Sequence, residues 1–290
     1  MARPSKVEVS AINIRINSDK ERNYALLLKN ILDQKIAMKV HGDTYLAVTA
    51  FDPKSGFGVF SRYTEIELEG DWFDIEKFGP ADESEINKVS IPDKLRPNLS
   101  SFRFKLFEEN HIIVFEVYSE SKALSAKYVE KYFIQILGRH NLRKTFGAVQ
   151  VDLIKNYEEV ERILALKNLR EIRILVKRPN QDDISGDLAS IIEERLAEQN
   201  AESLEEIVRT KEKDGLALNK RTKKLAFIGA ENGEISAKNY ENGMIIPHST
   251  EEKIEKISDT YFSEKTSAFQ MFRKVATRFR DSVVSRRRGI

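Results

Sequence analysis

Basic residues gather between positions 122 and 144, where six Lys and Arg residues stand against a single acid, Glu130. They are Lys122, Lys127, Lys131, Arg139, Arg143 and Lys144. Lys127 and Lys131 are one turn apart in a predicted helix whose other face is apolar, so both should point to solvent on the same side. We expect the last three to extend this stripe through the following loop. Such a stripe suits a phosphate backbone, because each contact releases condensed counterions and needs no base-specific geometry.

A second basic cluster lies at the end of the sequence. The last 26 residues, from Lys265, hold eight Lys and Arg residues and the single acid Asp281, whereas the whole chain has a formal net charge of +2. Residues 1–264 therefore carry −5. Arginine is frequent here, and its planar fork suits phosphate better than the point charge of lysine. We assign to nucleic-acid binding the residues Arg273, Lys274, Arg278, Arg280, Arg286, Arg287 and Arg288.

The same region predicts a long helix, from about residue 250 or 258 to residue 285. Its apolar residues recur at a and d spacing and form a seam that needs a partner surface. They are Phe262, Phe269, Phe272, Ala276, Phe279 and Val283. A homodimer would cover this seam and double the phosphate contacts on one duplex. Two alternatives stay open: the helix serves as a module that binds a partner protein or an anionic membrane, with its Phe residues in lipid in the latter case, or it packs on its own domain.

Several common chemistries are absent from the sequence. It has no cysteine, which excludes disulfides, thiolate metal sites and a cysteine nucleophile. It also lacks the usual phosphate-loop, dinucleotide, hydrolase and zinc motifs. We therefore expect no metal, no cofactor, no small-molecule substrate and no catalytic residue. The alternative is a Mg²⁺-dependent nuclease, which would need two acids and a lysine, for which Asp93, Glu120 and Lys122 are a loose match.

Composition and pattern predict a soluble α+β protein with mixed sheets, hairpins and packed helices in two lobes. The chain has 290 residues, 41% hydrophobic and 32% charged, and its start shows no apolar signal core, so we expect a cytoplasmic protein. Residues 1–178 should form one α+β domain, interrupted by an irregular excursion over 71–99. Residues 179–290 should hold an acidic helix, two strands meeting at a hairpin turn at Asn232-Gly233, and the basic helix.

The order of elements in the last 120 residues resembles the RexA-type phage-exclusion proteins of temperate phages. The resemblance rests on the strings LREIRILVKRPN (169–180), GAENGEISAKNYENG (229–243) and FQMFRKVATRFRDSV (269–283). It implies a homodimeric, sequence-nonspecific protein that binds double-stranded DNA without enzymatic activity, with a core fold like that of the RdgC proteins. RexA proteins act with a membrane effector protein, so such a partner is a further expectation.

Overall fold

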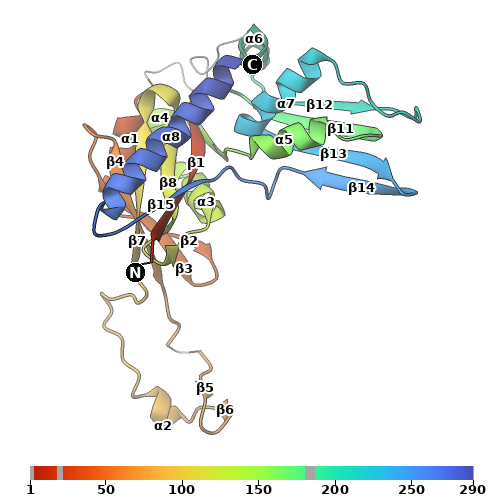
Figure 1. The fold of residues 1–290 in the computed structure, drawn as a ribbon. Coiled ribbons are helices and arrows are strands. Elements are labelled where there is room, and N and C mark those ends of the chain that lie inside the picture. Colours follow the sequence, from red (N-terminus) through yellow and green to blue (C-terminus); the bar gives the residue numbers. More distant parts are fainter. Residues whose placement is uncertain (1–2, 18–21, 69, 180–186, 290) are drawn as a thin grey trace.

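The computed structural model describes residues 3–17, 22–68, 70–179 and 187–289, and its fold is α+β, as the sequence predicts (Figure 1). The first lobe is built on a large antiparallel sheet in the order β10-β1-β8-β7-β4-β3-β2, with β9 beside β8 and β15 beside β1. The strands are β1 (Ser5–Asn17), β2 (Met38–His41), β3 (Thr44–Phe51), β4 (Phe57–Thr64), β7 (Ser100–Phe107), β8 (Ile112–Ser119), β9 (Lys122–Ala123), β10 (Ala148–Leu153) and β15 (Ile257–Tyr261).

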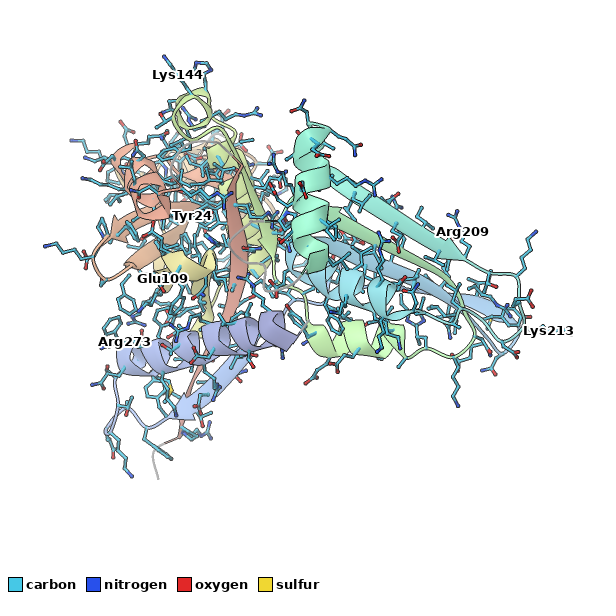
Figure 2. All side chains as sticks on the ribbon, turned by 90° about the horizontal axis from the view of Figure 1, so that it is seen from above. Tyr24, Glu109, Lys144, Arg209, Lys213 and Arg273 are labelled. Carbon is cyan, nitrogen blue, oxygen red and sulfur yellow. The ribbon has the colours of Figure 1, made fainter. Side chains whose placement is uncertain are left out.

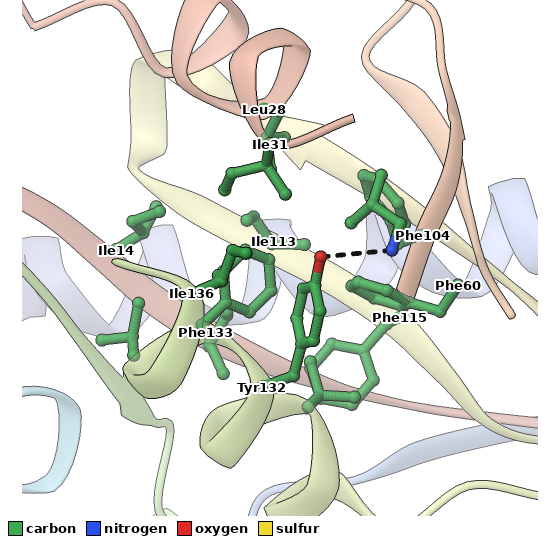
Figure 3. Close-up of a cluster of buried hydrophobic side chains, with 14 of the residues drawn as sticks. Ile14, Leu28, Ile31, Phe60, Phe104, Ile113, Phe115, Tyr132, Phe133 and Ile136 are labelled. Atoms are coloured by element: carbon green, nitrogen blue, oxygen red, sulfur yellow. Dashed lines mark hydrogen bonds between the residues drawn. The ribbon is translucent and has the colours of Figure 1, made fainter. Parts of the chain in front are cut away.

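One face of this sheet is covered by α1 (Tyr24–Asp33), α3 (Ala126–Leu137) and α4 (His140–Phe146). Alternate residues of the strands, such as Phe60 and Phe115, point into this core because side chains alternate along a strand (Figure 3). Tyr132 of α3 is buried among them, and its hydroxyl accepts a hydrogen bond from the Val48 N–H at 3.3 Å. Burial raises the pKa of Tyr132 to about 12. The helix α3 is thereby fixed on the sheet, with its polar side outward.

The opposite face of the sheet is covered by the long C-terminal helix α8 (Ala268–Gly289), which crosses β1 and β8 (Figure 1). This helix begins later than the sequence pattern predicts. Residues 257–261 instead form β15, which pairs antiparallel with β1, so that Val7 lies opposite Asp259. The prediction was wrong here because a strand pairing between residues about 250 positions apart leaves no local signal.

The second lobe has a smaller antiparallel sheet in the order β12-β11-β13-β14, with helices packed on it. Its elements are α5 (Tyr157–Leu164), β11 (Leu169–Lys177), α6 (Asp187–Glu198), β12 (Ser203–Arg209), α7 (Lys220–Asn232), β13 (Gly233–Glu241) and β14 (Met244–Ser249). The acidic helix predicted over residues 182–206 is observed as α6, which ends at Glu198; residues 203–206 belong to β12 instead, because they pair with β11, and residues 182–186 lie outside the described residues. Two lobes are present, but residue 178 does not divide them, since β11 pairs within the second sheet while β15 and α8 return to the first.

The hairpin predicted at Asn232-Gly233 is wrong. Asn232 ends α7, and its buried amide donates a hydrogen bond to the Ile228 carbonyl, while Gly233 begins β13. The tight turn of this region lies at Asn242-Gly243, where both residues have positive φ, 50° and 84°, and join β13 to β14. Such values are typical of a type I′ hairpin turn. The second Asn-Gly pair therefore forms the turn that the first one was predicted to form.

Residues 70–99, which we call the arm, leave the large sheet after β4 and return at β7 (Figure 1). The arm contains only short elements: β5 (Phe73–Asp74), β6 (Gly79–Pro80) and α2 (Glu83–Ile86). Its base is held by hydrogen bonds from the Thr64 N–H to the Pro97 carbonyl at 3.0 Å and from the Glu65 N–H to the Asp43 carbonyl at 2.9 Å. The segment predicted as an irregular excursion thus has little regular structure, and it projects away from both lobes (Figure 1).

Candidate nucleic-acid interface

The helix α3 presents two lysines to solvent in the way that the sequence predicts. Ser125 precedes the helix with extended backbone, and Gly138 follows its last turn. The buried face includes Val129, Phe133 and Ile136, which pack in the core under the sheet. Lys127 and Lys131 lie on the other side, but their surroundings differ. Lys127 forms an ion pair with Glu252, whereas Lys131 is exposed with no ion pair to any described residue.

The segment after Gly138 is a helix, α4, and not the predicted loop. Leu142 and Phe146 anchor it in the core, so the intervening polar residues face outward. Arg139, Arg143 and Lys144 are all exposed, and Figure 2 shows Lys144 extending from the outer edge of the first lobe. We call the four residues Lys131, Arg139, Arg143 and Lys144 the α4 surface. None of them forms an ion pair within the part of the chain that the structure describes.

Lys122 of the predicted stripe lies elsewhere in the first lobe. It is exposed on β9, which pairs with the end of β8 and turns there through Glu120 and Ser121 with positive φ. The predicted stripe is therefore interrupted between Lys122 and Lys131, because Lys127, which lies between them in the sequence, is paired with Glu252. Four of the six predicted residues are thus exposed and unpaired in the described part of the chain: Lys131 on α3, Arg139 just before α4, and Arg143 and Lys144 on α4.

Most cations of the C-terminal cluster are held by carboxylates of the same chain. Lys274 and Arg278 both pair with Asp259 of β15, at 3.1 and 3.4 Å. Arg286 pairs with the buried Glu255 at 3.1 Å, and Arg287 pairs with the buried Glu231 at 2.6 Å. Both arginines thus hold elements of the same chain together, Arg287 nearly buried and Arg286 half-buried, which corrects their assignment to a nucleic-acid surface. The side chain of Arg288 lies outside the described residues.

The apolar seam of α8 is covered by its own chain. Phe272, Ala276, Phe279 and Val283 are fully buried against β1 and β8. They cannot form a dimer interface, and the apolar face is not available to a membrane, because the large sheet already occupies it. Phe262 and Phe269 are 44% and 41% exposed and lie before and at the start of the helix. Of the alternatives left open by the pattern, packing on the same chain is the one observed.

Two arginines of α8 instead join a lysine that the sequence analysis missed. Lys105 Nζ of β7 lies 4.6 Å from the ring centre of Phe57 and 5.0 Å from that of Phe107. Arg273 lies over the Phe57 ring at 5.9 Å, and Arg280, which also pairs with its neighbour Asp281, lies over the Phe107 ring at 5.1 Å. Burial and the charges of the two arginines lower the pKa of Lys105.

We call this group, together with the exposed ring of Phe269, the basic–aromatic face. Its residues are Phe57, Lys105, Phe107, Phe269, Arg273 and Arg280. It lies on the α8 side of the large sheet, whereas the α4 surface lies on the side of α3 and α4. The two basic clusters therefore do not form one continuous surface, because the large sheet separates them.

A further basic patch was missed because α7 was not predicted as a helix. Lys220, Arg221, Lys223 and Lys224 are exposed in its first turns, while Thr222 and Leu225 are buried. Among the described residues none of these four cations has an ion-pair partner. Cations near a helix N-terminus oppose the helix dipole, so the patch is unfavourable for the helix itself. The string KRTKK is the signal that could have located it.

The residues considered for a nuclease do not assemble in the structure. Glu120 pairs with Arg103 of β7 at 3.4 Å, and Asp93 lies in the arm. Over the described residues, no group of three or more Asp, Glu or His side chains is placed to hold a metal ion. No metal-binding group among the described residues therefore supports the nuclease alternative.

The fold defines an α+β protein with two antiparallel sheets, a C-terminal helix packed across the larger one, and exposed basic surfaces on both lobes. The chain belongs to a protein family described as a domain of unknown function, DUF4747, whose model matches residues 5–277. No curated protein matches the chain. In the described part of the chain, no helix is both long and apolar enough to cross a membrane. The family match names no activity, so the resemblance to RexA-type and RdgC proteins stays a prediction.

Proposed function

We propose that this protein binds double-stranded DNA through its phosphate backbone, without sequence preference and without catalysis, at the α4 surface. The observation that carries the proposal is that Lys131, Arg139, Arg143 and Lys144 are each exposed, on or next to α3 and α4, with no ion pair among the described residues. Phage exclusion is the biological setting that we propose, on the basis of the resemblance alone.

The absence of carboxylate partners matters for the energetics. A lysine that already pairs with an acid, as Lys127 does with Glu252, must exchange that contact for a phosphate contact and gains little. An unpaired cation gives up only water and counterions, and the released counterions favour binding. The α4 surface is therefore the better phosphate-binding candidate of the two predicted clusters, since most of the C-terminal cations are paired internally.

The helix α4 also holds these cations in a defined arrangement. It is a short helix fixed by the buried side chains of Leu142 and Phe146, so Arg139 and Arg143, four residues apart, share one side of it. Contacts from such a surface reach phosphates and carry no sequence information by themselves. Binding to all duplex sequences with similar affinity is the expected behaviour.

The experiment is a fluorescence anisotropy titration of a labelled random-sequence duplex across a salt series, first with EDTA and then with Mg²⁺. We expect binding that weakens steeply with salt and no cleavage. In the triple variant Arg139→Ala, Arg143→Ala and Lys144→Ala, the slope of log affinity against log salt should flatten by about 0.9 for each lost phosphate contact. Wild-type protein that fails to bind at low salt, or that cuts with Mg²⁺, would contradict the proposal.

Two lysines on α3 provide a matched control. Lys131→Ala and Lys127→Ala remove the same side chain one turn apart on the same helix, but only Lys127 has an acidic partner. Lys131→Ala should weaken binding more than Lys127→Ala does. The variant Lys220→Ala with Lys224→Ala tests the α7 patch in the same assay. If only this last variant loses affinity, the DNA-binding surface lies on α7 and the assignment to α4 is wrong.

A further inference from the structure

The tip of the arm exposes large apolar side chains on an ordered hairpin. Phe73, Ile75 and Phe78 are 58%, 84% and 85% exposed. The turn is defined by hydrogen bonds: Asp74 accepts the N–H groups of Glu76 and Lys77 at 2.8 and 3.1 Å, and the Ala81 N–H donates to the Trp72 carbonyl. Figure 1 shows β5 and β6 far from both lobes. A structured apolar tip in water indicates a surface that another molecule covers.

The charge of the tip restricts what that molecule can be. Residues 71–78, with the sequence DWFDIEKF, contain three acids and one base, Lys77, which is paired with Asp82. A nucleic acid or an anionic membrane would repel such a segment. Its partner should instead combine exposed aromatic surface with cations that lack acidic partners of their own.

The basic–aromatic face of this same chain has that combination. The rings of Phe57 and Phe269 lie 5.1 Å apart, and Phe269 is 41% exposed. Lys105 and Arg273 lie over these rings, and neither is paired with an acid in the described residues. The acidic and apolar side chains of the tip are thus complementary in kind to the cations and aromatic rings of the face.

The tip does not reach the face of its own chain. Phe57 is the first residue of β4, and the arm leaves after Thr64, the last, which is about 23 Å farther along the strand. The hydrogen bonds at the base of the arm hold it pointing away from α8 (Figure 1). Contact between the tip and the face therefore requires two molecules.

We propose that two copies of this chain form a dimer in which the tip of each arm docks on the basic–aromatic face of the other. A two-fold axis makes the two contacts identical, so the assembly closes at two copies. Phe73, Ile75 and Phe78 would pack against Phe57 and Phe269, while Asp71 and Glu76 would pair with Lys105 and Arg273. This proposal does not rest on DNA binding, since the α4 surface lies on the other side of the large sheet.

The test is the mass of the full chain measured by light scattering over a concentration series, without DNA. We expect wild-type dimers, and a dissociation constant raised at least tenfold in a tip variant, Ile75→Asp with Phe78→Asp, and in a face variant, Lys105→Glu with Arg273→Glu. The control Leu95→Asp changes an arm residue that is 59% exposed but lies outside the tip, and it should stay dimeric. Lys105 is half-buried, so circular dichroism and urea denaturation must show that both variants keep the fold before their masses are compared.

Mixing the two variants distinguishes reciprocal docking from other assemblies. The tip variant keeps a working face and the face variant keeps a working tip, so one of the two contacts can form in a mixed pair. Native mass spectrometry, with one variant carrying a mass tag, should show mixed dimers and few dimers of either variant alone. Wild-type protein that stays monomeric at every concentration, or dimers that neither variant weakens, would overturn the proposal and leave the DNA-binding proposal untouched.

Discussion

The Arg287 Nε–H donates a hydrogen bond to the Glu231 carboxylate at 2.6 Å, joining the last turns of α8 to the end of α7. Both side chains are nearly buried, at 9% and 6% exposure, and the Tyr157 hydroxyl donates to the other Glu231 oxygen. Beside this contact, Asn232 Oδ1 accepts hydrogen bonds from the side chains of Asn13 and Arg15 of β1, at 2.9 and 3.0 Å. The junction between the lobes is therefore built from buried polar contacts and sets their relative position.

Removing Arg287 should destabilise the protein strongly. Arg287→Ala leaves the Glu231 carboxylate buried without its cation, which costs about 3–5 kcal/mol of unfolding free energy. Lys274→Ala, on the same helix, removes an exposed pair with Asp259 and should cost less than about 1 kcal/mol. Urea denaturation followed by circular dichroism measures both. Equal losses in the two variants would show that the Arg287 contact is no stronger than a surface pair.

The apolar side of α8 should behave as core. Phe272→Ala should lower the unfolding free energy by about 3–5 kcal/mol, because Phe272 is fully buried under the sheet. Phe269→Ala, one turn earlier and 41% exposed, should cost about 1 kcal/mol or less. The comparison needs thermal or urea unfolding together with light scattering. If Phe272→Ala turned dimers into monomers without lowering the unfolding free energy, the apolar residues of α8 would be a dimer interface after all.

Replacing the glycine of each Asn-Gly pair with alanine should lower the unfolding free energy by different amounts. Gly243 has φ +84° and open space around it, so Gly243→Ala should cost only the left-handed backbone, about 1–2 kcal/mol. A Cβ on Gly233 would lie 2.2 Å from the Leu175 carbonyl oxygen in the middle of the second sheet, so Gly233→Ala should cost about 3 kcal/mol or more. Denaturation midpoints rank the two variants, and the reverse order would contradict the assigned turn.

Glu116 should make stability depend on pH. Burial raises its pKa above the ordinary value of 4.5, although Arg103 donates hydrogen bonds from its backbone and its guanidinium. The folded state then binds this proton more tightly than the unfolded chain, so stability from this group is present below pH 4.5 and is lost as pH rises through the raised pKa. In Glu116→Gln that loss is absent, so the unfolding free energy of wild type minus variant should fall with rising pH.

A second carboxylate gives the opposite sign as a control for the pH series. A hydrogen bond from Lys274 lowers the pKa of Asp259, so its contribution is present at neutral pH and lost as pH falls through the lowered pKa. The difference between wild type and Asp259→Asn should therefore shrink towards acid pH. A Glu116→Gln difference that does not change with pH would mean that burial does not raise the Glu116 pKa.

The sequence alone predicted the elements that are determined by the residues within them. The alternation in β1, the apolar spacing of α3 with Ser125 before it and Gly138 after it, and the irregular arm all follow from the sequence and are observed. The exposure of Lys131 also follows from spacing, because the buried face of a helix determines its solvent face. The α+β class rests on the same kind of evidence.

Tertiary structure decided what each surface contacts. The apolar seam of α8 has the same spacing whether it meets a second copy or its own sheet, and only the position of β1 and β8 decides between them. Likewise, Lys127 and Lys131 look alike in sequence, and Glu252, more than a hundred residues away, distinguishes them. Lys105 comes close to Arg273 only because β7 lies beside the start of α8. Side-chain spacing determines which residues share a face, whereas the partner of that face depends on contacts between distant segments.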